Sequence, residues 1–236
     1  MSATTHPGAT SAPPPTKRHP YRQWAPDLQA LNLLGDKWTL PIIRHLAAGP
    51  KRFVELQRSM DGISTEQLRS RLNRMVADGL LTRQRYREVP PRVDYELTHR
   101  AIAAFPAIGA MARWGLQFTW GAPRPGETVN VAELFNLAPM LVTGYRRAAI
   151  VTLTVIDDAG ERKTVTVTLP RGAGVYAEVA RELPAGEADA MVSGTVGEWA
   201  GAFAPGSEGV VPTSSLSVRG DEQLAAHVVA QLTGRG

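Results

Sequence analysis

The chain contains 236 residues, of which 43% are hydrophobic and 20% charged, with a formal net charge of +4 and no cysteine. This length allows two domains with separate cores, and no stretch approaches the roughly 18 uninterrupted apolar residues of a membrane span. The lack of cysteine excludes a disulfide framework, a Cys-ligated metal and thiol chemistry.

Charge divides unevenly along the chain. Residues 17–124 carry 18 Lys and Arg against 9 Asp and Glu, whereas residues 125–236 carry 8 against 13. A basic half followed by an acidic half is expected when one domain meets a polyanion and the other serves a different purpose. The alternative is a chance partition of surface charge.

Residues 1–23 are rich in Pro, Thr, Ala and Ser and show no apolar periodicity, so we expect a disordered tail. The first ten residues also lack the basic start and apolar run of a signal peptide, which makes the cytoplasm the expected location. The basic end of the tail, TKRHPYR, either touches DNA as an arm or is solvated.

Three helices are predicted between residues 27 and 60. The first is capped by Asp27 and ends near Gly35, and the second restarts at Asp36 and ends at Gly49. The third, RFVELQRSM, is short and is followed by the turn DGI.

The segment from Ser64 to Asp78 carries clear helix signals. Ser64 and Gln67 fit a capping box, and Gly79 fits a C-terminal stop. An apolar stripe at helical spacing comprises Leu68, Leu72, Met75 and Val76. The opposite face collects Glu66, Gln67, Ser70, Asn73 and Arg74, with Arg69 and Arg71 on the flanks.

After Gly79 the period of the pattern changes to two, which predicts two strands around a turn at residues 90–91. Arg83 and Arg85 in the first strand either pair with Asp94 and Glu96 in the second or contact DNA. A helix from residue 98 to 120, kinked at residue 106, and a linker at 121–127 follow.

Three helices, a tight turn, a polar-faced helix and a two-stranded ribbon form the layout of a winged helix-turn-helix. In this layout the second helix of the pair enters the major groove. Hydroxyls, amides and cations contact bases and phosphates. The predicted DNA-binding residues are Lys51, Arg52, Ser64, Thr65, Gln67, Ser70, Arg71, Arg74, Arg87 and Arg92.

Each group of these residues has an expected partner. Gln67 suits adenine, and Arg71 or Arg74 suits guanine edges or phosphate. Lys51 suits the flanking backbone, and Arg92 at the wing suits a minor groove or phosphate. The alternative is that the arginines are solvated flanks of a three-helix core.

Five motifs stand together in this half: GDKW (35–38), GPKRFVEL (49–56), GIS (62–64), DGLLTR (78–83) and VPPRVDYELT (89–98). Over residues 25–120 the chain resembles the HxlR-type winged-helix transcriptional regulators. The resemblance implies a homodimer on a palindromic operator in double-stranded DNA, paired through the first helix and the helix near 99–120. It also implies residues 64–74 as the reading helix and Arg92 at the wing. Two departures are the lack of a cysteine near the first helix and the appended residues 128–236.

The predicted fold class is a mainly α winged helix-turn-helix domain, residues 24–120, followed by an α+β domain with a mainly antiparallel sheet, residues 128–236. The second domain should begin with a helix that carries Phe135 and Tyr145. A hairpin about residues 158–160, a helix near 174–183 and a strand near 189–194 follow. A helix capped by Thr195 and Glu198, a strand SLSVRG and a closing helix from Asp221 complete it.

Residues 188–232 resemble the end of a sterol-carrier-like lipid-binding domain, in which a strand ending in Gly-Asp precedes the final helix. The resemblance implies an apolar cavity between the sheet and its helices. The predicted lining residues are Phe135, Met140, Leu141, Tyr145, Met191, Trp199 and Phe203. The alternative is an ordinary packed core.

The five histidines are scattered without metal-ligand spacing, and no P-loop or nucleophile elbow occurs. We therefore expect no catalysis, cofactor or metal. The leading hypothesis is a dimeric transcriptional regulator, more a repressor than an activator. A small hydrophobic or aromatic effector in the second domain would act through the linker and the helix before it. One alternative is a dimerisation or partner-docking module without effector, and another is a lipid carrier whose basic half binds anionic surfaces.

Overall fold

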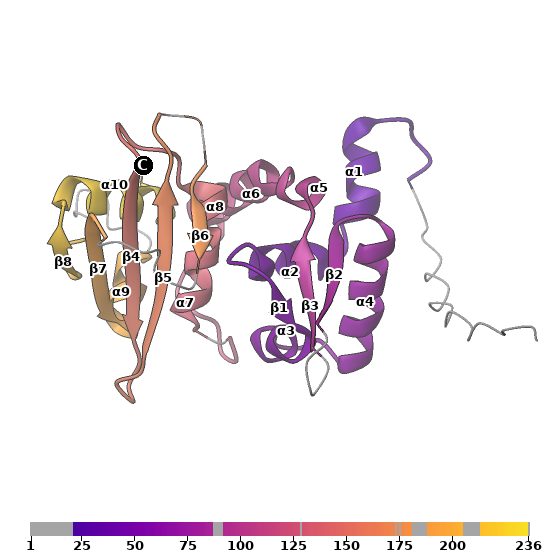
Figure 1. Cartoon of the computed structure of the whole chain (residues 1–236), viewed down its shortest axis with the longest axis horizontal. Coiled ribbons are helices and arrows are strands. Elements are labelled where there is room, and N and C mark those ends of the chain that lie inside the picture. Colours follow the sequence, from indigo (N-terminus) through magenta and orange to yellow (C-terminus); the bar gives the residue numbers. More distant parts are fainter. Residues whose placement is uncertain are drawn as a thin grey trace, which may run out of the picture.

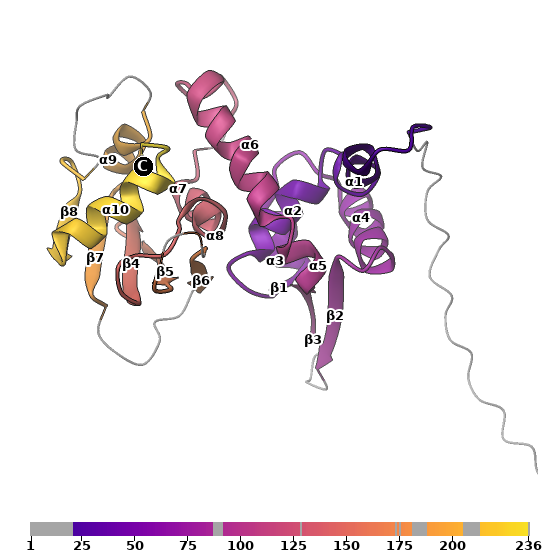
Figure 2. The same ribbon diagram turned by 90° about the horizontal axis from the view of Figure 1, so that it is seen from above.

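The computed structural model describes residues 21–86, 92–127, 129–172, 174, 176–180, 188–204 and 213–235. Most of the expected tail and the turn at residues 90–91 lie outside these ranges. Two halves stand side by side, each with its own sheet, and α6 lies between them in both views (Figures 1 and 2).

The N-terminal half contains six helices and a three-stranded sheet among its described residues. They are α1 (Pro26–Leu34), α2 (Thr39–Leu46), β1 (Lys51–Arg52), α3 (Phe53–Ser59), α4 (Thr65–Ala77), β2 (Leu81–Tyr86), β3 (Arg92–Leu97), α5 (His99–Ile102) and α6 (Phe105–Phe118). The strands pair antiparallel in the order β1-β3-β2. Ile42, Ile43, Leu56, Leu68 and Leu72 form the centre of the core, so the predicted apolar stripes of three helices meet there.

Local capping signals explain where most of these helices begin. Ser64 Oγ accepts from Gln67 N at 3.2 Å and Gln67 Oε1 accepts from Ser64 N at 3.1 Å, which confirms the capping box. Asp36 Oδ1 accepts from the backbone N–H of Trp38 at 2.9 Å. The cap predicted at Asp27 is wrong, because α1 begins one residue earlier at Pro26, whose fixed φ suits a first turn.

The strands of this half differ from the prediction in two ways. β1 is a third strand that the sequence pattern did not predict, and its two residues pair with β3 opposite Tyr95 and Asp94. Asp94 is also buried, with 1% exposure, and does not pair with Arg83 or Arg85. The predicted helix from 98 to 120 is broken into α5 and α6, with a proline in the first turn of α6.

The C-terminal half is an α+β unit with its helices on one side of a five-stranded sheet (Figure 2). Its elements are α7 (Val131–Leu134), the 3₁₀-helix η1 (Phe135–Leu137), α8 (Ala138–Leu141), β4 (Ala149–Ile156), β5 (Arg162–Leu169), β6 (Glu178–Ala180), β7 (Ala190–Thr195), α9 (Val196–Ala202), β8 (Ser217–Gly220) and α10 (Glu222–Leu232). The strand order is β6-β5-β4-β7-β8. β4 and β7 are parallel and the other neighbours antiparallel, so the sheet is mixed.

Two predicted helices of this half are wrong. Within the helix expected near 174–183, residues 178–180 instead form β6, because Val179 pairs with Val167 at the edge of the sheet. Sheet pairing here overrides helical propensity. The first helix also ends at Leu141, and Tyr145 lies beyond it in an isolated bridge with Arg171. The hairpin, the capping box of α9 and the closing helix are confirmed.

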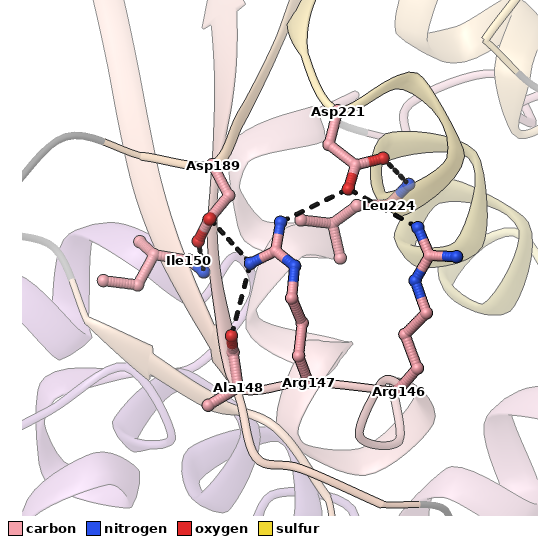
Figure 3. Close-up of polar contacts among 7 residues, drawn as sticks. All are labelled: Arg146, Arg147, Ala148, Ile150, Asp189, Asp221 and Leu224. Carbon is pink, nitrogen blue, oxygen red and sulfur yellow. Dashed lines mark hydrogen bonds and ion pairs between the residues drawn. The ribbon is translucent and has the colours of Figure 1, made fainter.

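A network of two arginines and two aspartates ties the chain before β4 to the starts of β7 and α10 (Figure 3). Arg147 Nη1 lies 2.6 Å from Asp189 Oδ1, and its Nη2 lies 3.3 Å from Asp221 Oδ2. The second oxygen of Asp189 accepts from Ile150 N at 2.8 Å, which fixes where β4 begins. Hydrogen bonds from backbone N–H groups and from Arg147 hold the pKa of Asp189 and of Asp221 below their usual range.

The lowered pKa of Asp189 and of Asp221 predicts that the folded chain loses stability in acid. Their folded-state pKa is depressed, so the stabilisation is present above an unfolded aspartate pKa of about 3.9 and is lost as pH falls through the lower folded value. Asp189→Ala should lower the free energy of unfolding at pH 7 by about 1–2 kcal/mol, because Ile150 N loses its acceptor. Urea unfolding at pH 7 and pH 3 measures both effects.

Asp158→Ala is the matched control, because Asp158 is an exposed aspartate in the turn between β4 and β5. The control should unfold like the parent chain at both pH values. Equal losses for the two variants would contradict the role assigned to the network.

Candidate DNA-binding surface and the junction between the halves

The polar start of α4 is exposed to solvent. Buried Leu68, Leu72 and Met75 anchor one side of the helix in the core. The start of the helix carries six exposed side chains. At about 100° per residue, Glu66 and Ser70 lie opposite the buried stripe, Gln67 and Arg69 lie on its flanks, and Ser64 and Thr65 lie at the N-terminal end. This set, which we call the α4 face, presents hydroxyls, an amide, a carboxylate and a guanidinium. These groups can contact both bases and phosphates.

The three arginines of α4 have different environments. Arg69 is exposed and lies 5.8 Å from the ring of Phe53. Arg71 Nη1 pairs with Asp36 Oδ2 at 3.0 Å and so ties α4 to the segment before α2. Arg74 was expected on the outward face, but its side chain is only 13% exposed and lies near Asp78 at 3.9 Å. The prediction for Arg74 is corrected: its neighbours cover a position that helical periodicity alone places outside.

Gln67 is exposed as predicted, but its carbonyl oxygen is used in the capping box. Pairing with adenine needs both the oxygen and the amide nitrogen. The adenine contact would therefore require Gln67 to leave the cap, whereas its amide nitrogen can donate from the capped position.

The predicted phosphate contact at Lys51 is wrong, since Lys51 is buried with 2% exposure. Pairing of β1 with β3 turns this side chain inward, while its neighbour Arg52 stays exposed at the start of α3. Arg52 N donates to Glu55 Oε2 at 2.6 Å, and Arg52 Nε lies 3.9 Å from Asp94. Arg52 thus remains a candidate contact and Lys51 does not.

The wing strands carry Arg92, whose guanidinium is anchored. Its Nε donates to both oxygens of Asp94 at 2.9 Å, and it stacks over the Tyr86 ring at 5.1 Å. Hydrogen bonding from Arg92 holds the pKa of Asp94 below its usual range, although burial opposes this. The arrangement fixes the direction of Arg92. Arg87 lies outside the described residues, and exposed Arg85 is the neighbouring cation on β2.

Lys37 is a candidate contact that was not assigned from the sequence. It is exposed, and its Nζ lies 4.5 Å from the Trp38 ring. A groove of about 440 Å³ runs between this segment and α4, lined by Lys37, Trp38, Glu66, Gln67, Ser70 and Arg71. The position of Lys37 within the GDKW motif was the signal in the sequence that could have identified it as a DNA contact. Only the folded chain places this lysine beside the α4 face.

A second surface of the N-terminal half is apolar and exposed. Met111, Trp114 and Phe118 follow one another along α6, and the rings of the last two lie 5.4 Å apart. Leu31 on α1 and Trp24 just before it are also exposed. Large exposed apolar patches mark interaction sites, and these are the two helices through which the resemblance implies pairing.

The two halves meet at a buried polar contact. His45 Nδ1 on α2 lies 2.7 Å from Glu133 Oε2 on α7, and Asn136 Nδ2 donates to the same oxygen. Arg44 Nη2, which can only donate, faces His45 Nε2, so we assign the imidazole proton to Nδ1. Burial keeps the pKa of His45 below its usual range, although the hydrogen bond to Glu133 opposes this.

Backbone packing adds to this junction. A Cβ built on Gly109 of α6 would stand 2.0 Å from Met140 O of α8, so the two helices touch through their backbones. Trp120 Nε1 donates to Phe203 O at 2.8 Å. The halves are therefore in contact through α2–α7 and α6–α8, in addition to the linker that the sequence suggested.

The residues expected to line a ligand cavity are dispersed or packed. Phe135, Leu141, Trp199 and Phe203 belong to the buried core, and Trp199 Nε1 donates to Thr154 O at 2.9 Å. Met140 packs in the core of the N-terminal half instead. Met191 is 45% exposed on the open side of the sheet, and Tyr145 packs on His227 with rings 5.0 Å apart. The predicted set does not enclose one cavity.

A different hollow of about 210 Å³ lies at the end of β4 among the described residues. Its lining includes Val129, Val131, Val155, Lys163 and Val196, none of which was predicted.

No helix in the described part of the chain is long and apolar enough to cross a membrane. Within the same ranges, no three His, Asp or Glu side chains gather as metal ligands.

An anchored helix with an exposed polar face, preceded by α3 and followed by a two-stranded wing, defines a winged helix-turn-helix DNA-binding protein. The family model for HxlR-like helix-turn-helix proteins matches residues 33–121. The chain belongs to this family, whose relatives are HTH-type transcriptional regulators.

Three relatives illustrate the match. An uncharacterized HTH-type transcriptional regulator of Halalkalibacterium halodurans is 41% identical over 88 residues, which are 37% of this chain and 78% of the relative. The putative regulatory protein MalR of Fusobacterium mortiferum is 35% identical over 86 residues, 36% of this chain and 81% of its own. The uncharacterized HTH-type regulator YybR of Bacillus subtilis is 33% identical over 97 residues, with 41% and 78% covered.

Proposed function

We propose that the chain is a homodimeric transcriptional regulator that binds a palindromic operator through the α4 face, and acts as a repressor. The observation that carries this proposal is the α4 face itself, anchored by a buried apolar stripe and flanked by exposed cations. Hydroxyls at the helix start suit a phosphate oxygen, and the side chains further along reach base edges.

The candidate phosphate contacts in the proposed complex are three exposed cations, Lys37, Arg52 and Arg69, and the half-buried Arg92. Arg52 and Arg92 were predicted from the sequence, whereas Lys37 and Arg69 take the place of Lys51 and Arg74 as contacts to the DNA backbone. Arg71 contributes by holding α4 against the segment before α2. Neutralised phosphates release counterions, so affinity should fall steeply with salt.

Arg69→Ala tests the role of the surface. Loss of one phosphate contact should weaken binding to operator and random duplexes alike, by about 3–10-fold, and reduce the salt slope by about one ion. Fluorescence anisotropy at several salt concentrations measures both quantities. Arg162→Ala removes the same charge from an exposed position on β5, and it should bind like the parent chain. Equal losses in both variants would reject the α4 face.

Two roles for the C-terminal half compete. The sterol-carrier-like resemblance suggests a small hydrophobic effector, whereas the packed surroundings of Trp199 favour a dimerisation or partner-docking module. Either role would reach DNA binding through the junction at His45 and Glu133. Thermal shift with a panel of apolar metabolites separates the two, because an effector must raise the melting temperature.

A further inference from the structure

The most outward side chain at the start of α4 is a carboxylate. Glu66 is the second residue of the helix and lies opposite the buried stripe at Leu68 and Leu72. It is exposed and lines the groove together with Lys37 and Ser70. Any duplex that receives the start of α4 therefore meets this carboxylate near the centre of the contact.

Glu66 stands in a basic setting without being neutralised by it. Lys37 Nζ lies over the Trp38 ring, and Arg71 is paired with Asp36. Among the described residues, Glu66 forms no ion pair within 4.0 Å. A glutamate is repelled by phosphate, so Glu66 cannot serve as a backbone contact.

DNA base edges, unlike the phosphate backbone, offer hydrogen-bond donors to a carboxylate. An ionised carboxylate only accepts hydrogen bonds. In the major groove, cytosine presents an amino donor at N4, whereas guanine presents acceptors at N7 and O6 and thymine an acceptor at O4. Adenine presents a donor beside an acceptor, and its N7 would oppose the second carboxylate oxygen.

We propose that Glu66 is a specificity-determining residue that requires cytosine at one position of each operator half-site. This inference rests on the proposed DNA-binding function and deepens it. Glu66 accepts from cytosine N4 and repels the acceptor edges of guanine and thymine. The α4 face thus selects its operator partly by excluding the wrong bases.

Selection of binding sites from a random duplex library tests this inference with the full chain and three variants. The parent chain should prefer cytosine at one half-site position by about tenfold. Glu66→Ala should lose the preference at that position alone, with equal or tighter overall binding because a negative charge is removed. Glu66→Gln should move the preference toward adenine, which an amide recognises through N6 and N7.

Glu96→Gln is the matched control, since Glu96 is an exposed glutamate on β3 and the change in charge is the same. It should keep the parental motif. A cytosine preference that persists in Glu66→Ala would overturn this inference while DNA binding stands. Enrichment of no sequence by the parent chain would overturn both the inference and the proposed function.

Discussion

Replacing Gly109 with alanine is expected to destabilise the chain by about 2–3 kcal/mol. The new Cβ would stand 2.0 Å from the carbonyl oxygen of Met140 and 2.9 Å from its carbon, both of which are backbone atoms. Neither can yield by a change of rotamer, so α6 and α8 must move apart. This cost exceeds the roughly 1 kcal/mol by which alanine is favoured over glycine in a helix.

Gly115→Ala provides the comparison on the same helix. The nearest atom to a Cβ at this position is Thr119 Oγ1 at 3.7 Å, an ordinary contact. Alanine should therefore leave stability unchanged or raise it by up to about 1 kcal/mol. Thermal and urea unfolding of the two variants decides the matter, and equal stability would show that α6 and α8 do not meet as described.

Trp114→Glu should convert the proposed dimer to a monomer. Trp114 is 58% exposed on the apolar side of α6 and lies between Met111 and Phe118. Tryptophan in such a position commonly contributes 2 kcal/mol or more to an interface, and a glutamate pair would add repulsion across a two-fold axis. A monomer holds only one half-site, so operator affinity should fall by about 100-fold or more.

Met191→Glu is the control for this change. Met191 is a large exposed apolar residue of the C-terminal sheet, far along the chain from α6. With pairing through α6, the control should remain dimeric in sedimentation equilibrium, whereas Trp114→Glu should not; loss of the dimer in the control alone would place the interface on the C-terminal sheet. Dimerisation of the Trp114 variant at the parental affinity would place the interface elsewhere.

Elements with local signals were predictable from the sequence. The capping box of Ser64 and Gln67 and the stripe of α4 specify that helix within one turn. The hairpin of β4 and β5 follows from alternation around a turn whose Gly160 adopts φ +81. Each of these features depends on residues that lie only a few positions apart, so it can be predicted from a single sequence.

Features set by distant contacts were not predictable. β1 has two residues and no periodicity, and Lys51 becomes buried only because β3 pairs with it. The exposure of Arg74 depends on the residues that cover it. His45 and Glu133 are 88 positions apart. The polar start of α4 could be predicted from the sequence, but the different environments of its three arginines could not.

Hydroxyl-radical footprinting on a selected duplex tests the central claim most directly. Two α4 faces related by a two-fold axis should protect two segments on one side of the duplex, centred about 10 base pairs apart. Protection should disappear when the half-sites are scrambled, and Arg69→Ala should weaken it in proportion to its effect on affinity. A uniform cleavage pattern, or protection that is indifferent to sequence, would contradict operator binding through α4.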